Sequence, residues 1–166
     1  PAPAGVPLTD ACILGCAMMT AYGAVKHQAR VQPNETVAVI GTGGVGSNVI
    51  QVAKVFGAGQ IIAVDVRDDK LEAARGLGAT HTVNAARQEA VAAVQTLTSG
   101  RGVDVAIEAL GRPETVVNAF MMTRDGGRTV VIGIAPGTTT AGIEITRLVR
   151  RGIQLIGSYG SRVRTD

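Results

Sequence analysis

The sequence is poor in the residue types on which several functions depend. Only 2% of the 166 residues are aromatic, tryptophan is missing, and the net charge is a mild +3. The basic residues are scattered apart from Arg147, Arg150 and Arg151, which we interpret as a solvated surface. Nucleic-acid-binding proteins combine a basic face with aromatic stacking groups. We therefore expect no nucleic-acid partner.

Long apolar runs and paired cysteines are also missing. No stretch approaches the roughly 20 apolar residues that span a bilayer, and no signal peptide opens the chain, so we expect no membrane partner. Cys12 and Cys16 are four residues apart, on one face of an expected helix, where they are poorly placed for a mutual disulfide. A reducing, cytoplasmic location is the resulting expectation.

Aliphatic residues dominate what is present. Hydrophobic residues make up 46% of the chain and charged residues 17%, which is typical of a well-buried globular domain. The apolar residues are mostly Val, Ile, Leu and Ala. This composition favours parallel strands that are covered by helices on both faces.

A glycine motif lies between an apolar strand and an amphipathic helix. The strand at 36–40 runs into Gly41-x-Gly43-x-x-Gly46, and apolar residues at helical spacing follow up to residue 56. In this arrangement Gly41 permits a tight turn, Gly43 lets the backbone approach a pyrophosphate, and Gly46 lets helix and strand pack closely. The pyrophosphate would bind the free N–H groups at the start of the helix.

An acidic residue follows at the spacing that a dinucleotide site requires. The second apolar strand, 61–64, ends at Asp65, 19 positions after Gly46, and an acid roughly 20 residues on holds the adenosine ribose. A carboxylate here also repels a 2′-phosphate, so we expect NAD to be preferred to NADP. Arg67 leaves that preference open, because an arginine there could accept the phosphate. A glycine-rich turn in an unrelated parallel-sheet domain is the simpler alternative.

The rest of the chain alternates between strand and helix patterns. We expect strands at 36–40, 61–65, 80–84, 104–108, 129–134 and 154–159, and helices at 10–26, 45–56, 68–77, 87–97, from Pro113 onward and around 146–151. This alternation predicts an α/β protein, a doubly wound six-stranded parallel sheet of the Rossmann fold, with strand order 3-2-1-4-5-6 and a ligand crevice between strands 1 and 4. Residues 1–25 would form a linker and a joining helix, and residues 26–166 the dinucleotide-binding domain.

Together, these segments resemble the cofactor domain of zinc-dependent medium-chain alcohol dehydrogenases from about residue 8 to residue 160. The residues that carry the resemblance are Gly15-Cys16-x-x-x-Thr20-Ala21-Tyr22-Gly23, Gly41-Thr42-Gly43-Gly44-Val45-Gly46, Val64-Asp65, Gly78-Ala79-Thr80, Val103-Asp104, Glu108-Ala109-Leu110-Gly111 and Ile132-Gly133-Ile134. No single motif is decisive, but their order and spacing make the combination specific.

The resemblance implies a role for each matched position. Cys16 corresponds to a ligand of the catalytic zinc, although by itself a cysteine is more often a small buried hydrophobe. The implied cofactor-binding positions are Thr20 beside the nicotinamide, Gly44 and Val45 on the pyrophosphate, Asp65 and Lys70 on the ribose, Ala109 and Leu110 along the cofactor, Ile132, Gly133 and Ile134 on the carboxamide, and Ser158 and Tyr159 beside the nicotinamide.

The resemblance also implies what this chain lacks. Members of the family carry a catalytic domain that supplies the other zinc ligands and the proton relay, and we find no His-x-x-Glu or cysteine-rich cluster to replace it. A catalytic zinc needs about three protein ligands. We therefore expect an alcohol–NAD oxidoreductase whose catalytic centre is incomplete here, so that the chain alone is inactive. The alternatives are a zinc-free quinone or enoyl reductase, which Cys16 disfavours, and a non-catalytic nucleotide-sensing module.

A homodimer is the expected assembly. Residues 138–145 are rich in β-branched residues and weakly charged, and Ile143 and Ile145 would face one side of an edge strand without a partner. Exposed edges recruit further strands, and a two-fold pairing of the same edge on two chains is the simplest closed arrangement. The resemblance implies the same assembly.

Overall fold

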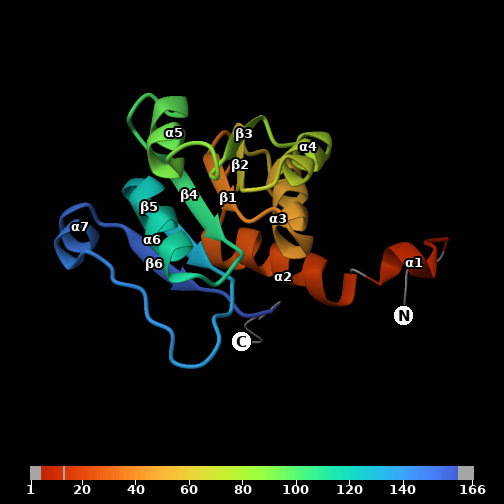
Figure 1. Cartoon of the computed structure of the whole chain (residues 1–166). Coiled ribbons are helices and arrows are strands. Elements are labelled where there is room, and N and C mark those ends of the chain that lie inside the picture. Colours follow the sequence, from red (N-terminus) through yellow and green to blue (C-terminus); the bar gives the residue numbers. More distant parts are fainter. Residues whose placement is uncertain (1–4, 13, 161–166) are drawn as a thin grey trace.

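Six parallel strands form a single sheet in the computed structural model, which describes residues 5–12 and 14–160 (Figure 1). The strands are β1 (Thr36–Ile40), β2 (Gln60–Asp65), β3 (His81–Asn84), β4 (Val103–Glu108), β5 (Thr123–Val131) and β6 (Gln154–Gly157). Their order in the sheet is β3-β2-β1-β4-β5-β6, and every neighbouring pair is parallel. The predicted doubly wound sheet and its strand order are confirmed.

Helices connect the strands and precede them. The elements are α1 (Leu8–Ala11), the wider π-type turns η1 (Leu14–Met18) and η2 (Gly23–Ala29) on either side of α2 (Met19–Tyr22), then α3 (Gly44–Val55), α4 (Asp68–Leu77), α5 (Ala90–Leu97), α6 (Pro113–Met122) and α7 (Ile145–Arg150). The segment expected as one helix at 10–26 is therefore mostly helical but not a regular α-helix. None of the helices in the described part of the chain is long and apolar enough to cross a membrane.

The core has two layers, one on each face of the sheet. Successive residues of a strand point to opposite faces. Val37 and Val39 of β1 thus pack with η2, α3 and α4, whereas Ala38 and Ile40 pack with α5 and α6. Figure 1 shows α3 and α4 on one side of the strands and α5 and α6 on the other. Because both faces are covered, every residue of β1 is buried, which explains the unbroken apolar runs of the sequence.

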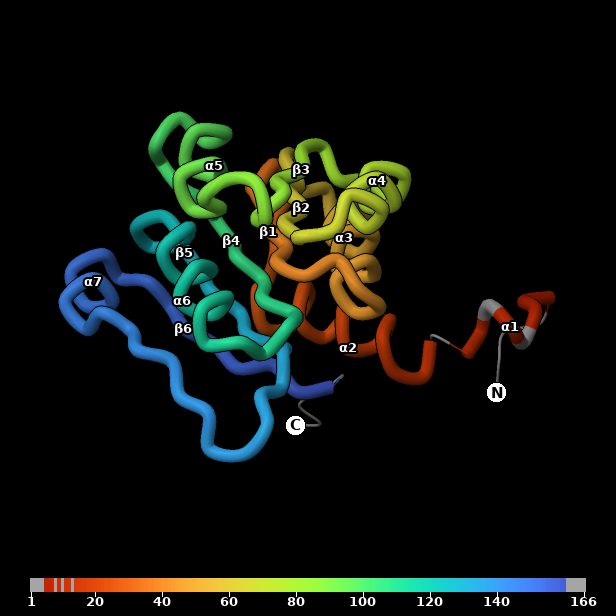
Figure 2. The backbone as a smooth tube through the Cα atoms, in the orientation of Figure 1, coloured from red at the N-terminus to blue at the C-terminus, as the bar shows by residue number. Residues whose placement is uncertain are grey.

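The predicted edge strand at 138–145 is wrong. Residues 138–144 have no regular structure, and α7 begins at Ile145. A strand requires a neighbour for its backbone hydrogen bonds, and within the sheet β6 already occupies the place beside β5. Figure 2 shows the segment after β5 swinging away from the sheet before it returns to α7.

A buried carboxylate ties the beginnings of three strands together. Asp104 of β4 accepts hydrogen bonds from the Thr36 N–H of β1 at 2.8 Å, from Arg101 at 3.0 Å and from Arg124 of β5 at 2.5 Å. Burial of Asp104 raises its pKa, but these hydrogen bonds and the two guanidinium charges outweigh that effect, so that its pKa lies below the ordinary 3.8.

We predict that Asp104→Asn lowers the free energy of unfolding at pH 7 by about 1–3 kcal/mol, because charge-assisted hydrogen bonds are lost. The stabilisation by a carboxylate with a lowered folded-state pKa is complete above its ordinary pKa and is lost as pH falls through the folded value. Urea unfolding at pH 7 and at pH 3 should therefore show the difference from wild type shrinking in acid. Asp125→Asn, at an exposed pair with Arg151, is the control and should change little. A difference independent of pH would contradict the prediction.

Candidate functional site

The carboxyl ends of five neighbouring strands bring most of the predicted residues together. The sheet register pairs Ile40 with Val64 and with Glu108, Glu108 with Val131, and Val131 with Gly157. The residues that follow these positions therefore lie side by side along the carboxyl ends of the strands. They include the glycine turn, Asp65, the 109–111 turn, the 132–134 segment and Ser158. In doubly wound sheets this edge is where ligands bind.

The glycine turn after β1 has a different geometry at each glycine. Gly41 has a φ of +86°, a left-handed conformation that favours glycine. A Cβ on Gly46 would lie 1.8 Å from the carbonyl oxygen of Gly41, so only glycine lets α3 pack this closely on the strand. By contrast, a Cβ on Gly43 or Gly44 would meet nothing within 4 Å. These two glycines leave an open cradle beside exposed backbone.

The first turn of α3 offers N–H groups to this cradle. Gly43 is the N-cap and has no side chain to cap the helix, so the first amides of α3 lack a capping partner. Behind them, Asn48 Nδ2 donates to the carbonyl of Gly44 at 2.6 Å. That carbonyl shares its peptide plane with the Val45 N–H, which therefore points the opposite way. Uncapped amides at the positive end of a helix dipole bind anions.

Asp65, at the end of β2, holds the glycine turn in addition to its predicted role. Its Oδ2 accepts from the Thr42 N–H at 2.8 Å and from the Thr42 hydroxyl at 3.0 Å, and its Oδ1 accepts from the N–H groups of Val66 and Arg67. Burial raises the pKa of Asp65, but these four hydrogen bonds lower it below its ordinary value. A neighbouring ribose would meet an ionised carboxylate that is already fixed in position. The sequence did not reveal the bond to Thr42, because Thr42 is an unspecified position of the glycine motif.

Arg67 is engaged elsewhere. Its guanidinium donates two hydrogen bonds to Asp69, at 3.0 and 2.5 Å, and the pair is exposed. A 2′-phosphate would have to displace Asp69 to gain this arginine. Lys70, in the first turn of α4, is half-buried. The geometry thus weakens the alternative that Arg67 favours NADP.

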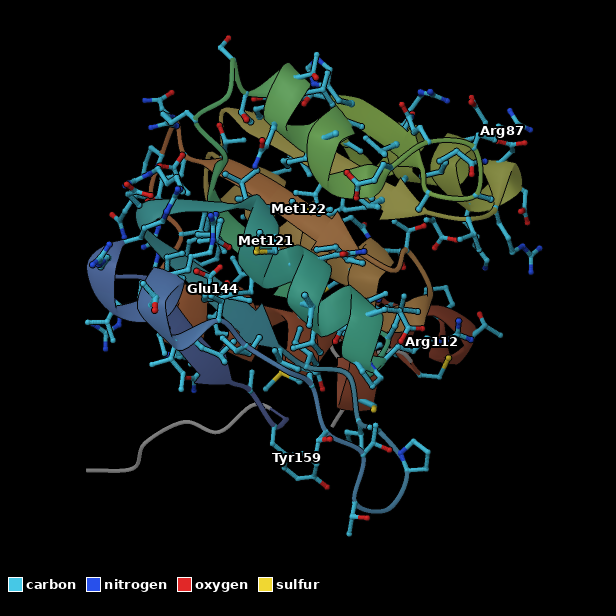
Figure 3. All side chains as sticks on the ribbon, turned by 60° about the vertical axis from the view of Figure 1, so that its left-hand side comes forward. Arg87, Arg112, Met121, Met122, Glu144 and Tyr159 are labelled. Atoms are coloured by element: carbon cyan, nitrogen blue, oxygen red, sulfur yellow. The ribbon has the colours of Figure 1, made fainter. Side chains whose placement is uncertain are left out.

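The turns after β4 and β5 touch each other through glycine. A Cβ on Gly133 would lie 1.9 Å from the Gly111 nitrogen, and a Cβ on Gly111 would lie 2.6 Å from backbone atoms of Ile134. Beside them, exposed apolar side chains of Leu110, Ile134 and Tyr159 line the same edge. Figure 3 shows Tyr159 pointing away from the sheet. Large apolar side chains exposed together are typical of a binding surface.

Ser158 carries an unsatisfied polar atom at this edge. The residue is buried, its N–H donates to the Val131 carbonyl at 2.9 Å, and its Oγ has no hydrogen-bond partner within the described structure. A buried hydroxyl without a partner costs free energy and calls for an explanation. A ligand group that hydrogen-bonds here would supply one.

The predicted metal ligand stands alone. Cys16 lies on η1 and is exposed, as is Cys12, and neither forms a disulfide. No group of three His, Cys, Asp or Glu side chains in residues 5–12 and 14–160 could hold a metal ion. Thr20, one helical turn later on α2, is half-buried, and α2 packs against α3. Within the described residues, Cys16 therefore lacks the three-ligand set that a catalytic zinc needs.

A hollow elsewhere on the surface does not coincide with the glycine turn. It has a volume of about 530 Å³ and lies between α4 and β3, where ion pairs of Asp68 with Arg87 and of Glu72 with Arg75 line it. Its charged groups are already in ion pairs, Asp69 with Arg67 outside the hollow, and no glycine is among its lining residues. The glycine turn and the turns after β4 and β5, not this hollow, form the candidate site.

Residues 44–166 match the family described as zinc-binding dehydrogenase. The chain belongs to this family. It is 36% identical over 130 residues to sorbitol dehydrogenase of Bacillus subtilis (strain 168), a match that covers 78% of this chain and 36% of the relative. The resemblance to the cofactor domain of zinc-dependent alcohol dehydrogenases is thereby confirmed.

Solved structures of this dehydrogenase family share the fold over nearly the whole chain. Benzyl alcohol dehydrogenase from Acinetobacter calcoaceticus superposes with a TM-score of 0.91 at 34% identity, covering 98% of this chain and 46% of the other. An alcohol dehydrogenase zinc-binding domain protein from Burkholderia ambifaria gives 0.92 at 32% identity, covering 96% and 43%. The chain thus spans less than half the length of these relatives.

We predict that Gly43→Val leaves the fold intact and abolishes dinucleotide binding, because the new side chain would fill the open cradle that we assign to the pyrophosphate. Calorimetric titration with NADH would show the loss, and the circular dichroism spectrum should stay unchanged. Gly76→Val on exposed α4, where a Cβ also meets nothing, is the matched control and should bind normally. If Gly43→Val kept its affinity for NADH, the cradle would not be the pyrophosphate-binding site.

Proposed function

We propose that this chain binds NAD(H) as the cofactor domain of an alcohol dehydrogenase that transfers hydride between an alcohol and NAD. The observation that carries the proposal is the open cradle of Gly43 and Gly44 in front of the uncapped amides of α3, with an ionised carboxylate at the end of the next strand. Family membership supports the same chemistry. The unsatisfied hydroxyl of Ser158 is a further polar group that a bound ligand would satisfy.

Each part of the dinucleotide has a proposed contact. The amides of Gly44 and Val45 bind the pyrophosphate, Asp65 and Lys70 bind the ribose, and Ala109 and Leu110 lie along the cofactor. The 132–134 segment holds the carboxamide, with Thr20, Ser158 and Tyr159 beside the nicotinamide. When bound, NAD supplies the hydride acceptor, and these residues orient it and exclude water from one of its faces.

Zinc enters the proposal only through Cys16. Its exposed thiol can provide one ligand, and the remaining ligands would come from parts of the protein outside the described residues. We propose that the chain alone does not oxidise alcohols, for this reason. Membership of a zinc-binding family favours a zinc-dependent alcohol dehydrogenase over a zinc-free quinone or enoyl reductase. A cytoplasmic location stays a prediction from the cysteine pattern of the sequence.

We predict that the chain binds NADH at least about tenfold more tightly than NADPH, since the Asp65 carboxylate would repel a 2′-phosphate by more than 1 kcal/mol at contact distance. Asp65→Asn keeps the shape but removes the charge, and should narrow that ratio. Fluorescence titration of the wild type and the variant with NADH and with NADPH measures both affinities. Glu72→Gln, which removes an exposed charge from α4, the helix after Asp65, should leave the ratio of the two affinities unchanged. Equal affinities of the wild type for the two cofactors would refute the assignment of NAD.

We also propose that two copies associate through the β6 edge of the sheet. β6 ends the sheet, and apolar side chains are exposed around it: Ile145 and Val149 on α7 are 75% and 72% exposed, and Leu155 on β6 is 42% exposed. A two-fold axis beside β6 would bury these residues and continue the sheet. This edge replaces the strand that the sequence predicted at 138–145.

We predict a dimer in light scattering at micromolar concentration and a monomer after Val149→Lys, because the introduced charge would be buried at the interface. Binding of NADH should survive, since the cradle follows β1, which β4 and β5 separate from β6 in the sheet. Val55→Lys, at an equally exposed apolar position of α3, is the control and should remain dimeric. A monomeric wild type would contradict pairing at β6.

A further inference from the structure

One carboxyl group at the end of β4 is fully buried and has no cationic partner. Glu108 is 0% exposed, and no Lys, Arg or His in the described part of the chain forms an ion pair with it. Both oxygens of its carboxyl group instead accept hydrogen bonds from uncharged donors. Oε1 accepts from the N–H groups of Leu110 and Gly111, each at 2.8 Å, and from the Thr115 hydroxyl at 2.7 Å. Oε2 accepts only a longer bond from the same Gly111 N–H, at 3.1 Å.

These hydrogen bonds fix the shape of the turn that follows β4. Gly111 has a φ of +76°, and both amides of the turn point back to the carboxyl group rather than outward. The Leu110 side chain lies against the glycine turn of β1, where a Cβ on Gly41 would come within 2.6 Å of Leu110 Cγ. The carboxyl group thus positions a side chain that it does not itself contact.

The backbone of Glu108 reaches the neighbouring strand as well. Its carbonyl accepts from the N–H of Ile132 at 2.8 Å and from that of Gly133 at 3.2 Å. Gly111, which the carboxyl group holds, packs directly on Gly133 and Ile134. One residue therefore fixes two turns against each other, by its side chain on the β4 side and by its carbonyl on the β5 side.

We propose that Glu108 is a positioning residue for the nicotinamide end of the cofactor, an inference that rests on the proposed function. The glycine turn has its own support in the Asp65–Thr42 hydrogen bonds. The 132–134 segment instead packs on the turn that Glu108 holds. Loss of the carboxyl group should therefore loosen the carboxamide contacts more than the pyrophosphate contacts.

The test compares NADH with ADP-ribose, which lacks the nicotinamide, on the chain as it is. Glu108→Met keeps the volume and removes the acceptor, leaving two buried N–H groups without a partner. We expect NADH to bind at least about tenfold more weakly and ADP-ribose to change less than about threefold. Glu108→Gln should bind within about twofold of wild type, because a single oxygen can keep the three shorter hydrogen bonds.

Two further variants separate positioning from folding. Thr115→Val removes one donor to the same carboxyl group without touching the turn, so it should lower the melting temperature and leave both affinities unchanged. Glu108→Asp keeps the carboxyl group but cannot reach both amides, and it should show the same difference between NADH and ADP-ribose if Glu108→Met does not fold. Equal losses of NADH and ADP-ribose, or no loss in either variant, would overturn the proposal. If the wild type bound neither NADH nor ADP-ribose, the result would instead contradict the proposed function, which is NAD(H) binding.

Discussion

Backbone segments at the carboxyl edge of the sheet approach each other so closely that no side chain fits between them. α3 meets the end of β1 where a Cβ on Gly46 would lie 1.8 Å from the Gly41 carbonyl, and the turns after β4 and β5 meet where a Cβ on Gly133 would lie 1.9 Å from the Gly111 nitrogen. These two contacts fix the position of the uncapped helix start and of the 132–134 segment. At Gly43 and Gly44, by contrast, a Cβ would meet no atom of the described residues within 4 Å.

Three acidic side chains stabilise this arrangement by accepting hydrogen bonds from backbone N–H groups. Asp104 binds the start of β1, Asp65 binds the glycine turn, and Glu108 binds the turn after β4. A carboxyl group that accepts several hydrogen bonds is held in one orientation, and in Asp65 and Asp104 these bonds also lower the pKa. In Asp65 the hydrogen bonds that fix the glycine turn also keep the pKa low, so that the side chain proposed to bind the ribose is a fixed, charged carboxylate.

Much of the fold was predictable from local patterns. The strand before the glycine motif, the helix at 68–77 and the proline that starts α6 at Pro113 all follow from periodicity and from backbone preferences. The strand expected at 138–145 failed for a physical reason: β-branched residues favour a strand only where a neighbour accepts the backbone hydrogen bonds, and β6 is already the neighbour of β5. Likewise, the segment expected as one regular helix before β1 contains wide turns, a detail that small apolar residues do not encode by themselves.

The sequence by itself determined the order of elements, the glycine motif and the acid that follows it, because the spacing of these residues is local and their backbone requirements are specific. Only the tertiary structure decided which groups are already occupied. It showed that Arg67 is paired with Asp69, that Asp65 holds Thr42, and that Glu108 links two turns from the end of β4. The bond between Asp65 and Thr42 and the link from Glu108 to the 132–134 segment join turns that are far apart in the chain and adjacent in the sheet. Hydrogen-bond partners of that kind leave no periodic or spacing signal in a single sequence.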